Sequence, residues 1–234
     1  MSRIALITGA NKGIGYETAR QLAAAGVSVL LGARAPERGH AAAASLGARF
    51  IQLDVTDEES IAGAAKTIED EFGVLDILVN NAGIGGEFAR PSVTPLSDMR
   101  RVFDTNLFGT VAVTKAMLQL LRRSGAGRIV NVSSELGSLH VATDRAGPIW
   151  SLITLAYPAS KAALNMVTVQ FAKELIDTPI KVNAVTPGYT ATDFTGGQGF
   201  RTAAQGAEIC VQMALLPDDG PTGIFIDDKG TVPW

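Results

Sequence analysis

The chain has 234 residues, a net charge of −3 and an apolar fraction of 47%, which favours one soluble α/β domain with a full hydrophobic core. The mixed charge pattern excludes the basic patch that nucleic-acid binding requires, and no apolar stretch is long enough to span a bilayer. The start of the chain lacks signal-peptide features, and the lone Cys210 excludes an internal disulfide. We expect a cytoplasmic protein without a nucleic acid, membrane or metal ion as partner.

Short apolar runs alternate with helical patterns along the whole chain, which is typical of parallel strands covered by helices on both faces. The predicted strands are 3–8, 28–33, 48–53, 75–80, 128–132, 181–185 and 223–227. The predicted helices are 14–24, 37–45, 58–72, 96–121, 160–175 and 201–215. This order predicts one Rossmann domain over residues 1–234, a doubly wound, seven-stranded parallel sheet with helices on both faces.

A glycine-rich loop, T-G-A-N-K-G-I-G at 8–15, joins the first predicted strand to the first helix. Glycines allow a tight turn and close approach to a pyrophosphate, and the helix N-terminus supplies free N–H groups. The spacing differs from G-x-G-x-x-G, so an ordinary strand-to-helix turn is the alternative. Its position after the first strand favours a dinucleotide site, with the predicted contacts Gly9, Asn11, Lys12, Gly13, Ile14 and Gly15.

The end of the second predicted strand indicates which dinucleotide binds. An acidic residue there holds the ribose 2′-hydroxyl of NAD, whereas an arginine accommodates a 2′-phosphate. This chain carries Arg34 and, one turn on, Arg38, with Lys12 nearby in the glycine loop. Solvated surface cations are the alternative interpretation. Because the three cations converge on one predicted pocket, we predict NADP(H) as the cofactor.

Later strand ends supply further candidate contacts. Asp54 and Val55 follow the third strand, where Asp54 could accept a hydrogen bond from an adenine amino group. Asn80, Ala82 and Gly83 close the fourth strand, where small residues let the backbone lie against the cofactor. For Asn80 a structural role, holding neighbouring strand ends together by its amide, is equally open.

Tyr157 and Lys161 are four positions apart and therefore share one face of a predicted helix. A nearby ammonium lowers the pKa of a phenol, so that Tyr157 could exchange a proton with a substrate oxygen near neutral pH. Ser134, at the end of the fifth strand, could hold that oxygen against the phenol. Alone, the pair could be a surface Tyr–Lys contact, and the serine could simply finish its strand.

Together and in this order, these motifs resemble the short-chain dehydrogenases/reductases over nearly the whole chain. The matching segments are the loop at 8–15, N-N-A-G at 80–83, the asparagine at 106, the serine at 134, Y-P-A-S-K at 157–161 and the P-G stretch at 187–192. The resemblance implies a nicotinamide-dependent oxidoreductase that moves a hydride between the cofactor and a carbonyl or alcohol carbon. Arg34, Arg38 and the chain end from 220 to 234 are similar to the NADPH-dependent carbonyl reductases.

The family's roles transfer residue by residue. The resemblance implies that Tyr157 is the general acid/base, that Ser134 orients the substrate, and that Lys161 contacts the ribose and lowers the phenol pKa. It implies that Asn106 holds a water in a proton relay to Lys161. It also implies contacts to the nicotinamide side of the cofactor from Pro187, Gly188, Thr190 and Thr192, besides Tyr157 and Lys161 themselves.

Ser134 and Tyr157 are 23 positions apart, farther than in most members of the family, because of an inserted segment near 139–155. This segment should lie beside the substrate and beside a helix surface that many relatives use to oligomerise, so the choice between monomer and homo-oligomer stays open. Apolar candidates for the wall of a small-molecule substrate pocket are Phe88, Leu136, Trp150, Tyr189, Phe194 and Phe200.

Two other function classes fit parts of the pattern. A catalytically silent NADP(H)-binding sensor would be free to lose one of the four catalytic candidates, all of which are present. A dehydratase or epimerase of the sugar-nucleotide type would need an added substrate domain, for which the chain is too short. The sequence therefore favours a carbonyl reductase or alcohol dehydrogenase.

Overall fold

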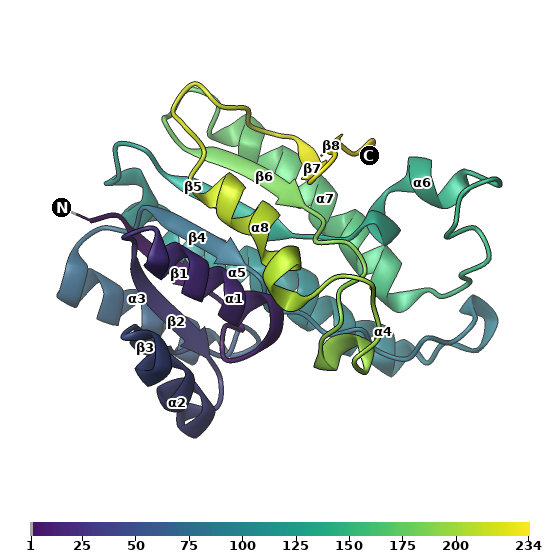
Figure 1. Ribbon diagram of the computed structural model, residues 1–234, viewed down its shortest axis with the longest axis horizontal. Helices are drawn as coiled ribbons and strands as arrows, with labels where there is room; N and C mark the ends of the chain where they lie inside the picture. Colours follow the sequence, from purple (N-terminus) through teal and green to yellow (C-terminus); the bar gives the residue numbers. More distant parts are fainter. Residues whose placement is uncertain (1) are drawn as a thin grey trace.

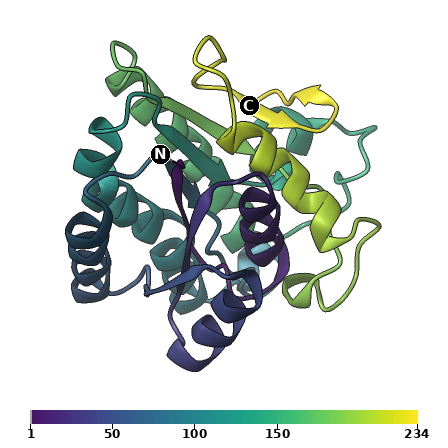
Figure 2. The ribbon, with the colours of Figure 1, turned by 60° about the vertical axis from the view of Figure 1, so that its left-hand side comes forward.

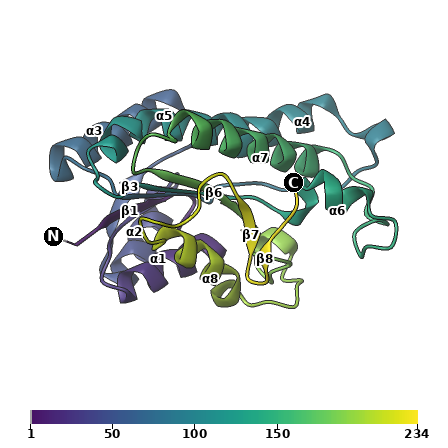
Figure 3. The same cartoon turned by 90° about the horizontal axis from the view of Figure 1, so that it is seen from above.

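The computed structural model describes residues 2–234 as a central sheet between two layers of helices (Figure 1; Figure 3). The strand order is β3-β2-β1-β4-β5-β6-β7-β8, in which the chain winds outward from β1 in both directions. This is the predicted doubly wound topology, with the crossover between β1 and β4. The strands are β1 (Ile4–Ile7), β2 (Ser28–Ala33), β3 (Arg49–Gln52), β4 (Ile77–Asn80), β5 (Arg128–Val132), β6 (Lys181–Val185), β7 (Phe225–Asp227) and β8 (Gly230–Thr231).

The sheet has eight strands, whereas the sequence predicts seven, all parallel. The first seven are parallel, and β8 is a two-residue strand that pairs antiparallel with β7. The carboxylate of Asp227 accepts hydrogen bonds from the backbone N–H groups of Lys229 and Gly230, at 2.7 and 3.0 Å, and so closes the turn between β7 and β8. A strand this short has no hydrophobic period, so the pattern that revealed the others was absent.

The helices cover the sheet on both faces (Figure 2; Figure 3). Helices α1, α2 and α8 lie on one face, and α3, α4, α5 and α7 lie on the other. Each face has its own apolar core, one centred on Leu22, Leu31 and Met213 and the other on Leu30, Ile68 and Met117. The helices are α1 (Gly13–Ala24), α2 (Pro36–Leu46), α3 (Glu58–Phe72), α4 (Leu96–Phe103), α5 (Gly109–Arg122), α6 (Leu139–Thr143), α7 (Ala156–Glu174) and α8 (Ala203–Ala214).

The segment 96–121, predicted as one helix, is two α-helices joined by a π-helical turn, η2 (Asp104–Phe108). Such a turn adds one residue to the helical repeat and is frequent at functional sites. It contains Asn106, whose side chain is buried against other elements rather than exposed as the outer face of a regular helix would be. Hydrophobic periodicity does not detect a single extra residue, which explains why the prediction missed the break.

The inserted segment starts with the short helix α6 and is tied to the end of the chain. The Ser138 hydroxyl donates a hydrogen bond of 2.6 Å to the Pro233 carbonyl, and the His140 N–H donates to the Trp234 carbonyl. The Trp234 ring stacks on Phe225 in β7, with 5.6 Å between the ring centres. The start of the segment is therefore joined to the chain end beyond β8, whereas the loop after α6 projects away from the sheet (Figure 1). Within residues 2–234, no helix is both long and apolar enough to cross a membrane.

Candidate active site

The ends of β4 and β5 are held together by buried amides. The Asn80 side-chain NH₂ group donates to Asn131 Oδ1 at 2.9 Å and to the Thr114 hydroxyl at 3.0 Å. The Asn131 NH₂ group in turn donates to the Thr168 hydroxyl in α7 at 2.9 Å. Asn80 is 3% exposed and does not reach the cleft surface. Of its two sequence interpretations, the geometry selects the structural one.

The glycine loop has the conformation that a bound pyrophosphate requires. Gly9 and Gly13 have φ values of +63° and +60°, where a side chain would be strained. A Cβ on Gly15 would lie 2.4 Å from the Asn81 amide, and one on Gly9 would lie 3.0 Å from Cα of Ala82. The first turn of α1 has no side-chain cap, so its N–H groups remain available to an anion.

Asn81 holds this loop in place, a role that the sequence analysis missed. Its side-chain NH₂ donates to the carbonyls of Thr8 and Gly9, and the Thr8 hydroxyl accepts from the backbone N–H of Asn81. These bonds join the end of β1 to the segment after β4. The only sequence signal is the N-N-A-G motif itself, in which the second asparagine, not the first, serves the cofactor loop.

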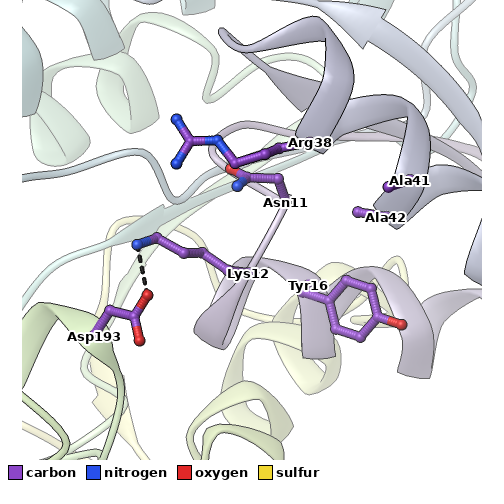
Figure 4. A pocket seen from close by; sticks show the side chains of 7 residues that line it. All are labelled: Asn11, Lys12, Tyr16, Arg38, Ala41, Ala42 and Asp193. Carbon is purple, nitrogen blue, oxygen red and sulfur yellow. Dashed lines mark hydrogen bonds and ion pairs between the residues drawn. The ribbon is translucent and has the colours of Figure 1, made fainter.

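A cavity of about 460 Å³ opens between the glycine loop and α2 (Figure 4). Its polar lining comes from Asn11, Lys12, Arg38, Tyr16 and Asp193, which include two of the three cations predicted for the 2′-phosphate. Lys12 donates a hydrogen bond of 2.7 Å from Nζ to Asp193 Oδ2. This pair lowers the pKa of Asp193, so its carboxylate is charged. An acidic partner for Lys12 was not expected from the sequence.

Arg34 does not line that cavity. It faces a second cavity of about 500 Å³, which Thr56, Ile84 and Arg100 also border. The three predicted cations therefore divide between two cavities, and the prediction that they converge on one pocket is wrong. Oδ1 of Asp54 accepts hydrogen bonds from the Thr56 N–H and hydroxyl at 2.9 and 2.7 Å, so this carboxylate fixes the turn that borders Arg34.

Val55 is buried, and its carbonyl oxygen would lie 2.6 Å from a Cβ on Gly109, the first residue of α5. The backbone after β3 therefore packs closely on the start of α5. Val55 follows the third strand, but its side chain is part of the apolar core that includes Leu30 and Met117.

Tyr157 and Lys161 both lie in the first two turns of α7, which begins at Ala156, four residues before the predicted start. Nζ of Lys161 is 5.7 Å from the centre of the Tyr157 ring and donates a 2.7 Å hydrogen bond to the Val132 carbonyl at the end of β5. Lys161 is 4% exposed. The helix spacing thus brings the phenol and the ammonium together beside the end of β5, which Ser134 follows by two residues.

Burial dominates the ionisation of both groups. It raises the pKa of Tyr157 to about 12, and the nearby Ser134 hydroxyl acts against this rise in the lowering direction. Burial also lowers the pKa of Lys161 to about 8. The sequence predicts a Tyr157 pKa lowered by Lys161, and for the chain by itself that expectation is wrong. Desolvation of the phenolate outweighs the nearby cation.

Ser134, and not its neighbour Ser133, faces Tyr157. The Ser133 hydroxyl is buried and donates to Asn165 Oδ1 at 2.6 Å, which ties β5 to α7. Ser134 begins the short 3-10 turn η3 (Glu135–Gly137), where its hydroxyl accepts from the Leu136 N–H at 3.2 Å. The two neighbouring serines are thus divided between structure and the cleft.

Asn106 is fully buried and connects three elements. Its NH₂ group donates to the Ile84 carbonyl and to the Ser160 hydroxyl, while its Oδ1 accepts from the Ile84 N–H at 2.8 Å. A Cβ on Gly83 would lie 3.3 Å from this Oδ1 and 3.7 Å from Lys161 Nζ. Both amide protons are therefore engaged, so any water relay at Asn106 would have to use carbonyl oxygens.

The P-G stretch after β6 carries one residue that faces the cofactor loop and one that does not. Thr192 approaches Gly13, where a Cβ would lie 3.6 Å from the threonine methyl group. Thr190 is buried, and its hydroxyl donates to the Pro187 and Gly188 carbonyls. Thr190 supports the turn at Gly188, which has a φ of +72°, rather than lining the cleft.

Two of the six pocket-wall candidates touch Tyr157. The ring centres of Phe88 and Phe194 lie 6.5 and 5.4 Å from that of Tyr157. Both rings also approach Gly85, where a Cβ would lie 3.1 Å from Phe88 and 3.4 Å from Phe194. They form an apolar rim around the phenol.

The other aromatic candidates pair elsewhere. Tyr189 packs edge-on against Phe200, 6.1 Å between ring centres, and Trp150 lies beneath the Arg145 guanidinium of its own loop. Leu136 is partly exposed beside Ser134. The prediction that all six rim one pocket is therefore not supported by the contacts for Trp150, Tyr189 and Phe200.

This sheet, glycine loop and Ser–Tyr–Lys cluster define a nicotinamide-dependent oxidoreductase of the Rossmann type. The family model described as short chain dehydrogenase matches residues 3–199, and the chain belongs to that family. A protein named short-chain dehydrogenase anuI from Penicillium roqueforti (strain FM164) is 39% identical, covering 98% of this chain and 95% of that protein. Carbonyl reductase (NADPH) 1 of Mus musculus is 35% identical, with 99% and 98% covered.

Among solved structures, the NADPH-bound carbonyl reductase from chicken fatty liver superposes with a TM-score of 0.87 at 27% identity, covering 100% of this chain and 99% of that one. The predicted fold class and family are thus confirmed. The inserted segment does not disturb the match, because both chains are covered almost completely.

Proposed function

We propose that this protein is an NADP(H)-dependent carbonyl reductase that converts ketones or aldehydes to alcohols, with Tyr157 as general acid. Tyr157 and Lys161, in the first two turns of α7, converge with Ser134, which follows the carboxyl end of β5. This convergence is the observation that carries the proposal. The similarity to carbonyl reductases of mouse and chicken supports the substrate class and the cofactor.

The residues present fit a dinucleotide. Positive φ at Gly9 and Gly13, the absence of room for a Cβ on Gly15, and the uncapped start of α1 together make a cradle for a pyrophosphate. Arg38 and Asn11 border the adjoining cavity that we assign to the 2′-phosphate. When bound, the cofactor supplies the hydride.

The protein's own groups handle the proton and the substrate oxygen. The Ser134 hydroxyl hydrogen-bonds the carbonyl oxygen and holds it beside the phenol. Tyr157 donates its proton as negative charge develops on that oxygen. With a pKa of about 12, the phenol is protonated at neutral pH, which is the state that reduction requires. Lys161, charged below a pKa of about 8, stabilises the phenolate that remains.

Replacing the phenol tests the mechanism. Tyr157→Phe should lower kcat for ketone reduction by about 10²- to 10⁴-fold, the usual contribution of a general acid, while NADPH still binds in a fluorescence titration. Tyr189→Phe is the matched control, because its hydroxyl bonds only Gln198, at 3.1 Å. Full turnover by Tyr157→Phe would refute the mechanism, and NADPH binding without turnover of any ketone or aldehyde by the unmodified protein would indicate a sensor.

Cofactor preference tests the assignment of the arginines. Exchanging Arg34 and Arg38 together for Ala should lower the NADPH/NADH ratio of kcat/KM by about 10²- to 10⁴-fold, because each charge-assisted contact to a phosphate contributes roughly 1.5–3 kcal/mol. The ratio comes from initial rates with the two cofactors. An unchanged ratio would remove these arginines from the 2′-phosphate site. The single variants would show whether Arg34, which faces the second cavity, contributes as much as Arg38.

A further inference from the structure

The loop at 192–198 is connected to the rest of the protein by a single hydrogen bond. Across residues 2–234, all other hydrogen bonds of this loop stay within residues 189–201. The exception is the 2.7 Å bond between Lys12 Nζ and Asp193 Oδ2. Gly196 and Gly197, with φ values of +63° and +78°, make the remainder of the loop pliable. The Lys12–Asp193 ion pair is therefore its one polar attachment to the glycine loop.

The same ion pair lies inside the cavity that we assign to the 2′-phosphate. Asn11, Lys12, Arg38 and Asp193 all line it, and Figure 4 shows the Lys12 side chain directed at Asp193. Both side chains of the pair are well exposed, 57% for Lys12 and 75% for Asp193. An exposed pair of this kind is weak and exchanges readily for a stronger anion. A phosphate dianion offers more charge and more acceptor oxygens to Lys12 than one carboxylate does.

Asp193 also stands next to a residue of the catalytic rim. Asp193 and Phe194 are consecutive in the three-residue turn η4 (Asp193–Thr195). The Phe194 ring lies 5.4 Å from the Tyr157 ring and against Gly85. One short turn therefore carries both an ion pair to the cofactor loop and an aromatic ring over the phenol.

We infer that Asp193 competes with the 2′-phosphate of NADP(H) for Lys12, so that nucleotide binding releases the 192–198 loop and frees Phe194 to adjust around a substrate. This inference rests on the proposed function, since it needs the NADP(H) assignment. In the structure, Lys12 holds the loop through its ion pair with Asp193. With the phosphate bound, Lys12 turns to the ligand and the loop loses its ion pair to the glycine loop. Asp193 is thereby a specificity-tuning and positioning residue, acting through Lys12 and Phe194.

The affinity test uses adenosine 2′,5′-bisphosphate and 5′-AMP, which differ only by the 2′-phosphate. Asp193→Asn should bind the bisphosphate about two- to fivefold more tightly than the unmodified protein in low-salt titration calorimetry, as expected for removal of an exposed competing ion pair. Its affinity for 5′-AMP should not change. Asp70→Asn is the matched control, because it removes one charge from the exposed pair Lys66–Asp70, which is 2.8 Å long and separate from the cavity.

If Asp193 had only a structural role, Asp193→Asn would loosen the loop and would leave the affinity for the bisphosphate unchanged or lower it. An equal gain for both ligands, or for Asp70→Asn, would likewise overturn the inference. In a Lys12→Met background the gain from Asp193→Asn should disappear. If it persisted, Asp193 would be acting by direct repulsion and not by competition for Lys12.

Hydrogen exchange supplies the second readout. Amides of 193–199 should exchange faster when the unmodified protein is saturated with the bisphosphate, and no faster with 5′-AMP. Slower exchange with the bisphosphate would mean that the ligand orders the loop and would overturn the release. If the unmodified protein does not prefer the bisphosphate to 5′-AMP, the NADP(H) assignment fails, and this inference fails with it. A clear preference that Asp193→Asn leaves unchanged removes only the role of Asp193.

Discussion

The cleft has two walls that are held in different ways. The inner wall, formed by the ends of β4 and β5 and by α7, is buried and fastened by amide and hydroxyl bonds such as those of Asn131 and Asn106. The outer wall, formed by the 192–198 loop and the residues around Phe88, is exposed. The loop rests on an aromatic contact and one ion pair, and the segment around Phe88 on an aromatic contact and the 2.8 Å bond from the Glu87 N–H to Asp98 Oδ2. Phe88 is 56% exposed and Phe194 is 44% exposed, although both rings contact the Tyr157 ring.

This difference separates the two tasks of the site. A proton-transfer group must stay within hydrogen-bond reach of a substrate oxygen, so Tyr157 and Lys161 lie on a rigid helix supported from beneath. A wall that admits substrates of varied shape gains from mobility, because few buried contacts and few external hydrogen bonds allow local opening. Variants of the inner wall should therefore alter stability, and variants of the outer wall should alter substrate affinity.

The largest effect on stability is expected at the centre of the inner wall. Asn131→Ala removes the acceptor for Asn80 and the donor to Thr168, leaving buried polar groups without partners. The free energy of unfolding should fall by about 1–3 kcal/mol, measured by urea denaturation. Ser45→Ala, which removes an exposed hydroxyl bonded to Tyr16, should change it by less than about 0.5 kcal/mol. Equal effects of the two variants would contradict the proposed division between the walls.

On the outer wall, Phe194→Ala should raise KM for a bulky aromatic ketone by about two- to tenfold, since an aromatic contact contributes roughly 0.5–1.5 kcal/mol. Steady-state kinetics should show kcat nearly unchanged, and the melting temperature should not move. Phe200→Ala is the matched control, because Phe200 is 82% exposed and pairs with Tyr189 instead of Tyr157. A similar KM increase in both variants would show that the rim extends to Phe200.

A pH slope is also expected in the stability of the inner wall. Burial lowers the pKa of Lys161 from its ordinary 10.5 to about 8, so the folded protein binds fewer protons than the unfolded chain between these values. The contribution of Lys161 to stability therefore rises with pH in this window, by at most about 1.4 kcal/mol per pH unit.

Tyr157 acts in the opposite direction at higher pH, because its pKa is raised from 10.0 to about 12 and its contribution is lost as pH rises through that range. Denaturation of Lys161→Met from pH 8 to 9.5 should show a flatter dependence than that of the unmodified protein or of Lys115→Met, whose lysine is exposed. Parallel curves for Lys161→Met and the unmodified protein would show that Lys161 is not desolvated as the structure indicates.

The sequence by itself determined the strand–helix alternation, the glycine loop, and the presence and spacing of Ser134, Tyr157 and Lys161. These features depend on local periodicity, on φ values that only glycine adopts readily, and on residue spacing along one helix, all of which are written in neighbouring residues.

The tertiary structure alone decided which of these side chains face the cleft and which hold it together. The side chains of Asn80 and Thr190 are buried, and Asn81, not Asn80, contacts the glycine loop. Asp193, 181 positions along the chain from Lys12, forms an ion pair with it. The Tyr157 pKa was likewise decided by burial, which sums over every element packed around the phenol. Such properties depend on contacts between residues distant in the chain, and a one-dimensional pattern carries no information about their distances.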